Sequence, residues 1–385
     1  MIKRKITSEL LQAVKDYPIV TIIGPRQSGK TTLCKLTFPD YHYCSLEDPD
    51  IRAFALNDPR AFLNEYSSYV IFDEIQRVPE LLSYLQGIVD TKQTKGQFIL
   101  TGSHQLKLRA EITQSLAGRT DLLTLFPLTI SEVLSCTDRK DRDELLFHGF
   151  FPRIYQDNLE PNRAYSNYYQ TYIERDVRQL INLKTISLFE KFLKLLAGRV
   201  GQIINFNSLS NDVGVSSTTL KEWLAVLEVS FIIVKLEPYF ENFGKRVIKS
   251  AKIYFIDTGL LAFLLNIESP KILARDPLIG NIFENMVVLE SIKTRLNKGL
   301  QANLYFFRDS NGLEVDLLYK KGSQLIPIEI KSSSTFNKVF AKGLSKFQKL
   351  TNNSDKGYII YAGDFTPKSE RYEVVNFINT EKLFV

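Results

Sequence analysis

A glycine-rich loop near the N-terminus constrains the fold of this chain more than any other feature of its sequence. An apolar run at residues 18–23 leads into a segment that fits G-x-x-x-x-G-K-[ST], and a helical stretch at residues 31–36 follows. This order predicts a buried strand, a phosphate-binding loop and a helix whose N-terminus faces an anion. The expected nucleotide-binding residues of this segment are Gly24, Pro25, Arg26, Gln27, Ser28, Gly29, Lys30, Thr31 and Thr32.

An acidic pair supplies the rest of this predicted site. Residues 69–72 are an apolar strand candidate that leads into Asp73 and Glu74. We expect Asp73 to order a Mg²⁺ shell and Glu74 to polarise the attacking water. Lys30 should reach the β- and γ-phosphates, and the Thr31 hydroxyl should hold Mg²⁺. The sequence therefore predicts ATP and Mg²⁺ as ligands and hydrolysis as the reaction, with helix capping by the acidic pair as the weaker alternative.

Two further positions suggest how hydrolysis is sensed and completed. Residues 97–103 form a strand candidate that ends in Thr101 and Ser103, which would lie near the γ-phosphate. Arg119 precedes another strand candidate, where an arginine can reach the nucleotide of a neighbouring subunit. An arginine near a helix end also interacts favourably with the helix dipole. The first interpretation of Arg119, as an arginine finger, predicts a homo-oligomer.

Short apolar strands alternate with helical stretches through residues 1–145. The strand candidates are residues 18–23, 69–72, 97–100 and 122–128. Continuous apolar runs of this kind are typical of parallel strands that helices cover on both faces. We therefore expect an α/β P-loop core of AAA+ type in residues 1–145.

The middle of the chain changes to helical patterns. Residues 146–185 are expected to form a helical lid or linker. The tyrosine-rich stretch 164–183 predicts one long helix within it, whose tyrosines pack between domains. Stacking of these tyrosines on nucleic-acid bases is the alternative. Residues 186–268 have the outline of a winged helix, which is helix, glycine turn, helix and hairpin. Glutamates among its basic residues leave protein docking as the alternative to DNA contact. The expected DNA-binding residues are Lys221, Lys245, Arg246 and Lys249, and Lys252 is a further basic residue expected to line the wing.

Charged residues mark the strand candidates of the last part, residues 269–385. Glu314 and Asp316 alternate on one strand, and Glu329 and Lys331 alternate on the next. Asp316 and Glu329 could share Mg²⁺ beside Lys331, and this spacing matches the PD-(D/E)XK nuclease pattern. Solvated strand faces, or a nuclease-like fold that binds DNA without cutting it, are the alternatives. The predicted nuclease-like site comprises Glu284, Asp316, Glu329 and Lys331.

Segments along nearly the whole chain resemble a prokaryotic family that joins an archaeal-type AAA+ ATPase core to a C-terminal domain long described only as of unknown function. The resemblance implies an AAA+ core, a winged helix and a domain similar to the PD-(D/E)XK nuclease fold. The archaeal relatives look like DNA-associated ATPases. The segments that carry the resemblance are GPRQSGKTTL, VIFDEIQRVPELL, FILTGSHQL, SLAGRT, HGFFPRIY, YIERDV, GNIFENMVVLES, FFRDSNGLEVDLL and PIEIKSS.

Composition limits where such a chain can work. The 385 residues are enough for two or three domains, and the sequence has neither a signal-peptide pattern nor a membrane-spanning apolar run, which predicts a cytoplasmic protein. Three cysteines without metal-ligand spacing suit a reducing compartment. The net charge of +6 permits nucleic-acid binding without demonstrating it.

These features together predict an AAA+ ATPase that binds DNA, with branched DNA as one candidate ligand, and that couples its nucleotide state to DNA engagement. Two rival interpretations stay open. One is a metal-dependent nuclease in repair or defence, which cleavage of plasmid DNA would identify. The other is a switch-type signalling ATPase whose winged helix contacts protein, which the absence of salt-sensitive DNA binding would favour.

Overall fold

The computed structural model describes residues 2–92, 94–103, 115–177, 186–240, 250–351 and 356–384. The chain divides into two compact units. The first contains residues 1–128 with 229–231 and 296–300, and the second contains the other segments of residues 129–385. The four-part division expected from the sequence is finer than this and stays a prediction. No helix within the described ranges is long and apolar enough to cross a membrane.

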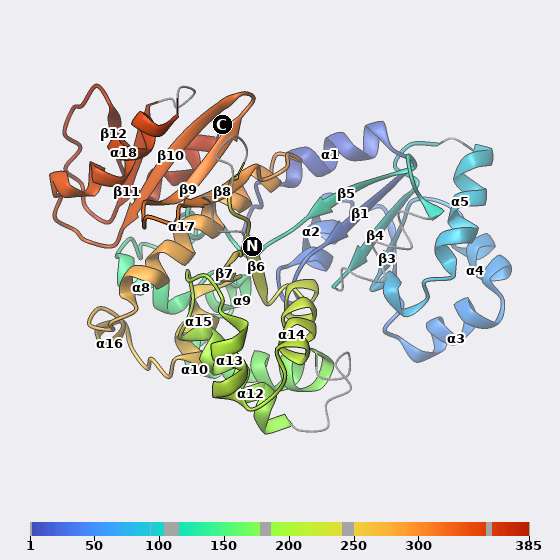
Figure 1. Ribbon diagram of the computed structural model, residues 1–385. Helices are drawn as coiled ribbons and strands as arrows, with labels where there is room; N and C mark the ends of the chain where they lie inside the picture. Colours follow the sequence, from blue (N-terminus) through green and yellow to red (C-terminus); the bar gives the residue numbers. More distant parts are fainter. Residues whose placement is uncertain are drawn as a thin grey trace. The chain divides into compact units, whose positions relative to one another are not determined.

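A five-stranded parallel sheet forms the centre of the first unit (Figure 1). Its strand order is β2-β3-β4-β1-β5, so β1 lies between β4 and β5. Apolar side chains of the sheet pack with α1 and α2 in one core. Sheets of this kind bind ligands at the carboxyl ends of their strands. The elements are α1 (Thr7–Asp16), β1 (Ile19–Ile23), α2 (Lys30–Thr37), β2 (His42–Ser45), α3 (Pro49–Asn57), α4 (Pro59–Glu65), β3 (Val70–Asp73), η1 (Ile75–Arg77), α5 (Leu81–Lys92), β4 (Phe98–Gly102) and β5 (Thr120–Thr124).

The expected α/β core with a parallel sheet is confirmed, and the structure corrects one strand and adds another. The strand expected at 122–128 is β5, which ends at Thr124. Residues 125–128 lie beyond β5, and Pro127 among them has no N–H to donate to a neighbouring strand. The sequence analysis also missed β2, an edge strand whose His42 and Tyr43 are exposed. Because β2 carries exposed polar side chains, it lacks the apolar run by which the sequence analysis found the other strands of this sheet.

Helices dominate the first part of the second unit. Three of them, α12, α13 and α14, precede an antiparallel pair of strands, β6 and β7. The elements are α7 (Ile130–Leu134), α8 (Arg142–His148), α9 (Pro152–Gln156), α10 (Pro161–Tyr168), η2 (Tyr169–Val177), α12 (Ile186–Ala197), α13 (Phe206–Val213), α14 (Ser217–Val229), β6 (Ile233–Leu236), β7 (Lys252–Phe255), α15 (Thr258–Leu264) and α16 (Pro270–Leu273).

The tyrosine-rich stretch is not one continuous α-helix as predicted. The α-helix α10 ends at Tyr168 and the π-helical segment η2 continues to Val177, while residues 178–185 lie outside the described ranges. Tyr165, Tyr168 and Tyr172 are each 1% exposed, so their rings cannot receive a base and serve as core.

A mixed five-stranded sheet forms the last part of the second unit. Its order is β12-β11-β10-β9-β8, with antiparallel pairing from β8 to β10 and parallel pairing from β10 to β12. The helix α18 packs Leu344 and Phe347 onto this sheet. The edge strand β12 was not predicted. The elements are α17 (Ile279–Leu296), β8 (Leu304–Arg308), β9 (Glu314–Lys321), β10 (Gln324–Lys331), η4 (Lys338–Ala341), α18 (Lys342–Leu350), β11 (Gly357–Tyr361), β12 (Tyr372–Asn376) and η5 (Phe377–Phe384).

Candidate active sites

The predicted phosphate loop lies between the carboxyl end of β1 and the start of α2. Lys30 is buried, and its Nζ donates to the carbonyl oxygens of Gly24 and of the proline that follows it, each at 2.9 Å. The guanidinium of Arg4 donates to the carbonyl oxygens of Ser28 at 2.6 Å and of Phe126 at 2.7 Å. Two buried cations therefore hold the loop. Arg4 lies outside the motif, and the sequence analysis missed it.

The loop meets the requirements of a nucleotide-phosphate site. A Cβ atom at Gly24 would lie 2.1 Å from the carbonyl oxygen of Leu125, so only glycine fits there. Gly29 has a φ of 92°, a left-handed conformation that favours glycine directly before α2. The Ser28 hydroxyl is buried without a hydrogen-bond partner among the described residues. Because buried polar groups normally find a partner, this hydroxyl and the helix N-terminus beside it fit a phosphate oxygen.

The other predicted residues of the loop point in different directions. Gln27 takes a left-handed conformation, with a φ of 62°. Arg26 Nη2 lies 3.6 Å from the Oε1 atom of Glu47, which is also 3.8 Å from Arg77. Thr32 is exposed on α2. Nucleotide contacts by these three positions stay a prediction.

Three hydroxyl groups hold the carboxylate of Asp73 at the end of β3. The Thr31 hydroxyl lies 3.1 and 3.0 Å from its two oxygens, the Tyr43 hydroxyl donates at 2.7 Å, and the Thr101 hydroxyl donates as well. Burial and the bond to Asp73 raise the pKa of Tyr43, so this phenol stays a donor. Hydroxyl donors orient a carboxylate without cancelling its charge. Thr31 and Asp73 therefore fit Mg²⁺, which prefers oxygen ligands.

Glu74 is held in a strained backbone conformation beside Asp73. Its φ of 58° and ψ of 47° are left-handed, an uncommon region for glutamate that often marks functional sites. Its Oε2 accepts from the Ser103 hydroxyl at 2.9 Å and from the Gln76 side-chain amide. The structure thus brings Ser103 to Glu74. Gln76 was missed, although it follows Glu74 by two residues in the same motif.

The pKa of Lys30 reflects two opposing effects in this site. Burial lowers the pKa of Lys30, and the nearby carboxylates of Glu74 and Asp73 act in the opposite direction. A buried ammonium that donates only to backbone carbonyls gains strongly from an added anion. The polyphosphate of a nucleotide is such an anion.

Arg119 is bound within its own unit. Its guanidinium donates to both carboxylate oxygens of Asp90, at 2.6 and 2.8 Å, and its side chain is 31% exposed. The hydrogen bonds from Arg119 lower the pKa of Asp90. To act as a finger in a neighbouring subunit, as predicted, Arg119 would have to leave Asp90. That role stays a prediction.

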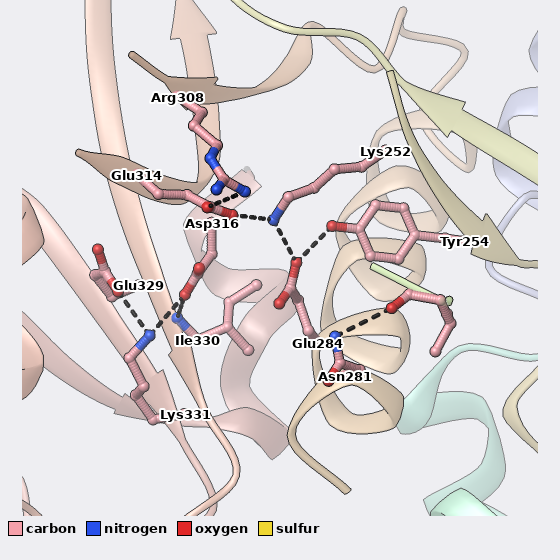
Figure 2. A network of polar contacts seen from close by, with 11 residues as sticks. Lys252, Tyr254, Asn281, Glu284, Arg308, Glu314, Asp316, Glu329, Ile330 and Lys331 are labelled. Carbon is pink, nitrogen blue, oxygen red and sulfur yellow. Dashed lines mark hydrogen bonds and ion pairs between the residues drawn. The ribbon is translucent and has the colours of Figure 1, made fainter. Parts of the chain in front are cut away.

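The predicted C-terminal residues Asp316, Glu329 and Lys331 do come together, on the neighbouring strands β9 and β10 (Figure 2). Lys331 Nζ lies 2.9 Å from Asp316 Oδ2 and 2.7 Å from Glu329 Oε2. The Ile330 N–H also donates to Asp316 Oδ2, at 2.8 Å. A Cβ atom on Gly343 of α18 would lie 2.2 Å from Glu329 Oε1, so this helix closes over the site.

Glu284 belongs to the same network but has its own partners. Lys252 Nζ lies 3.1 Å from Glu284 Oε1 and 2.6 Å from Glu314 Oε1. The Tyr254 hydroxyl donates to Glu284 Oε1 at 2.5 Å, and Arg308 lies 3.3 Å from Glu314 (Figure 2). The expectation that Lys252 lines an exposed wing is wrong, because its side chain is 3% exposed and is paired with these acids. The sequence analysis missed Tyr254, which also comes from β7, far from the nuclease-like pattern.

Burial and neighbouring charges shift the pKa values of the acids in this second site. Burial raises the pKa of Glu284, and burial together with the charge of Asp316 raises the pKa of Glu329 to about 8. Burial would also raise the pKa of Asp316, but Lys331 and Lys252 outweigh it and lower that pKa. Within the described ranges, no group of three or more acidic, histidine or cysteine side chains is arranged to hold a metal. As arranged, these donors do not fit the predicted Mg²⁺.

Part of the predicted DNA-binding surface can be located. Lys221 is exposed on α14, and its Nζ lies 5.6 Å from the centre of the Phe206 ring. The helix α13 ends at Gly214, whose left-handed φ of 93° turns the chain toward α14. Lys245, Arg246 and Lys249 lie outside the described residues.

Comparisons with protein families agree with the geometry of the first site. Residues 16–134 match a family model described as an AAA domain. Residues 139–271 and 279–382 match two domains of unknown function, DUF8612 and DUF4143. The fold, the phosphate loop and the AAA match define the protein as an AAA-type P-loop ATPase.

Curated relatives extend over most of the chain. The uncharacterized protein Rv2008c of Mycobacterium tuberculosis is 32% identical over 336 residues, which cover 86% of this chain and 74% of that protein. This chain belongs to the same family. The uncharacterized protein MJ1637 of Methanocaldococcus jannaschii is 25% identical over 377 residues, covering 84% of this chain and 74% of that protein.

Solved structures give weaker similarities. A Walker-type ATPase of Pyrococcus abyssi is 15% identical, with a TM-score of 0.43, and the match covers 69% of this chain and 96% of that one. RuvB of Thermotoga maritima is 20% identical, with a TM-score of 0.31, and the match covers 60% of this chain and 88% of that one.

Proposed function

We propose that this ATPase couples hydrolysis at the β1–β3–β4 edge to the binding of DNA by its second unit, and that it works as a homo-oligomer. In the hydrolytic step Lys30 neutralises the β- and γ-phosphates, and Glu74 orients the attacking water. Thr31 and Asp73 would hold Mg²⁺, which would neutralise charge on the phosphate oxygens. Ser103 and Gln76 keep the Glu74 carboxylate in place through their hydrogen bonds.

One observation carries the DNA proposal, and it is a row of lysines on η4 and α18. Lys338, Lys342, Lys346 and Lys349 are all exposed. Their spacing of four, four and three residues puts them along one side of the helical segment. None of the four has a carboxylate within ion-pair distance in the part of the chain that the structure describes. Residues 330–354 contain no aspartate or glutamate, so no acidic neighbour in that stretch offsets their charge.

The opposite side of α18 explains why these lysines face outward. Leu344 and Phe347 are fully buried against the mixed sheet, and the Phe347 ring lies 5.0 Å from that of Phe307. An amphipathic helix fixed in this way holds its lysine side toward solvent. A row of unpaired ammonium groups suits the regularly spaced phosphates of a nucleic-acid backbone.

The arrangement of α13, α14, β6 and β7 supports the same proposal. A short helix, a glycine turn, a second helix and an antiparallel pair of strands have the order of a winged helix. In helix-turn-helix proteins the N-terminal part of the second helix contacts the groove. Lys221 lies in that part of α14 and is exposed.

Salt dependence of DNA binding tests the proposal. We expect the full chain to bind duplex and four-way DNA with an affinity that falls steeply as salt rises. Replacing the four lysines of α18 and η4 by glutamine should lower the slope of log affinity against log salt by about 3–4, since each lost phosphate contact removes roughly 0.9. Fluorescence anisotropy at several salt concentrations, with and without ATP, measures the slope.

The matched control removes the same charge elsewhere. Lys15, Lys92, Lys95 and Lys298 are exposed lysines of the first unit, and their fourfold glutamine variant should keep the wild-type slope. If both variants lowered the slope equally, the change in net charge alone would explain the effect. No binding by the wild-type chain to any DNA form would reject DNA as the partner and favour the protein-docking alternative.

A further inference from the structure

The buried lysine of β7 occupies the centre of the C-terminal carboxylate site. The side chain of Lys252 is 3% exposed, and its Nζ lies within ion-pair distance of Glu284 from α17 and Glu314 from β9. Burial would lower the pKa of Lys252, but Glu284, Asp316 and Glu314 outweigh it and raise that pKa. The lysine is therefore charged and acts as the counter-ion of these acids (Figure 2).

The two lysines of the site are paired with one oxygen of each of its four carboxyl groups. Lys252 lies against Glu284 Oε1 and Glu314 Oε1, and Lys331 lies against Asp316 Oδ2 and Glu329 Oε2. Glu284 Oε1 also accepts from Tyr254, and Asp316 Oδ2 accepts from a backbone N–H. A divalent cation that bound three of these carboxylates would have to share them with both ammonium groups.

The charge balance leads to the same conclusion. The network contains four carboxyl groups, on Glu284, Glu314, Asp316 and Glu329, and three cations, on Lys252, Arg308 and Lys331. Because the raised pKa of Glu329, about 8, favours its protonated form at neutral pH, at most three carboxylates face three cations there. A buried site that its own side chains nearly neutralise gains little from Mg²⁺, and freeing the lysines would leave them unpaired in a dry environment.

The fold holds Lys252 in this position. The side chain of Asn285 on α17 accepts from the Phe255 N–H at 2.7 Å and donates to the Phe255 carbonyl at 2.8 Å. Asn285 is fully buried, and through it α17 is hydrogen-bonded to the backbone of β7 three residues beyond Lys252. These bonds fix the backbone of β7, and the two ion pairs of Lys252 then hold its ammonium group at the acids.

We infer that Lys252 takes the place of a divalent cation in the C-terminal site and keeps this site closed to metal. The site then stabilises the fold, and it does not cut DNA while Lys252 occupies it. This inference does not depend on DNA binding, because it concerns metal occupancy. Failure of the DNA-binding experiment would leave it untouched.

Metal binding to the full chain tests the inference. We measure Mn²⁺ binding by electron paramagnetic resonance without nucleotide, well below the melting temperature. The wild type should show no site that depends on Asp316, so Asp316→Asn should bind as much Mn²⁺ as the wild type does. Lys252→Met should gain one Mn²⁺ per chain, and the double variant with Asp316→Asn should lose it again.

Lys235→Met is the matched control. Lys235 lies on β6, and its one ion pair among the described residues is with Glu228, at 2.6 Å, so its loss should create no metal site. A wild-type Mn²⁺ site that Asp316→Asn removes would overturn the inference, and this outcome does not require the Lys252 variant to fold. A folded Lys252→Met protein that gains no site would also overturn it.

Discussion

The two carboxylate sites of this protein use similar residues in opposite ways. At the first, Asp73 and Glu74 are held by hydroxyls and a side-chain amide, while Lys30 donates to backbone carbonyls. At the second, Lys252 and Lys331 pair directly with the acids. Hydroxyl donors orient a carboxylate and leave its charge for a ligand, whereas an ammonium group cancels it. Partner chemistry, more than the acids themselves, decides whether such a site is open to Mg²⁺.

Removing the lysine from each site tests this contrast most strongly. Lys30→Ala should abolish tight ATP binding and measurable turnover, because its ammonium group is kept for the phosphates. Lys252→Met should leave turnover intact and lower the free energy of unfolding of the second unit by about 3–5 kcal/mol, since buried acids lose their counter-ion. Nucleotide titration and denaturant unfolding measure the two effects. The contrast fails if the two variants show the same pattern of losses.

Removing one acid from each site is the next test. Glu74→Gln should keep ATP binding and lower turnover by about 10²-fold or more, because phosphate contacts survive while water activation does not. Glu284→Gln, in the second site, should hydrolyse ATP at the wild-type rate. Steady-state hydrolysis and equilibrium nucleotide binding separate the two steps. Wild-type turnover in Glu74→Gln would remove Glu74 from its proposed role.

Arg119 tests whether the first site is completed by a second subunit. Arg119→Ala should lower turnover at least about tenfold with little change in nucleotide affinity, because the arginine stabilises transition-state charge. Mixing it with Lys30→Ala should restore part of the activity through one intact interface. Asp90→Asn breaks the same ion pair but keeps the arginine, and it should stay active. A strictly monomeric protein under ATP, without rescue on mixing, contradicts the finger.

The pH dependence of stability sharpens the description of the second site. The pKa of Glu329 is raised from 4.5 to about 8, so between these values the folded chain holds a proton that the unfolded chain has released. Stability therefore falls as pH rises through this window. Glu329→Gln should show a smaller fall in melting temperature from pH 5 to 9 than the wild type. Glu373→Gln, on an exposed pair with Lys356, should follow the wild type. Parallel curves for wild type and Glu329→Gln would show that this acid is charged throughout.

The smallest expected effect comes from one of the hydroxyls on Asp73. Tyr43→Phe removes a single hydrogen bond of about 1 kcal/mol, while Thr31 and Thr101 remain. We expect turnover to fall about fivefold and to need more Mg²⁺. Tyr41→Phe is the control, because its hydroxyl bonds the Gly96 carbonyl away from the site. If the turnover of both variants depended on Mg²⁺ equally, the Tyr43 hydroxyl would have no role in the Mg²⁺ site.

Sequence reasoning succeeded where the residues of a site are neighbours in the chain. The loop from Gly24 to Thr31 and the pair Asp73–Glu74 each sit at the end of one apolar strand, and parallel pairing brings such ends together. Asp316, Glu329 and Lys331 were also placed correctly, because they lie on consecutive antiparallel strands. It missed Arg4 and Tyr43 and assigned Lys252 to the wing, because the partners of these three residues are distant in the chain.

The sequence by itself determined the class of this protein, because eight consecutive residues can fold into only one kind of phosphate loop between a strand and a helix. It also determined which acids meet on β9 and β10, since strand alternation is a local rule. Only the tertiary structure decided what those acids do. Lys252 reaches them from β7 through the packing of β7 against α17, and that packing depends on the three-dimensional fit of distant segments. No local pattern in the chain encodes such a contact, and here it determines the charge of the site.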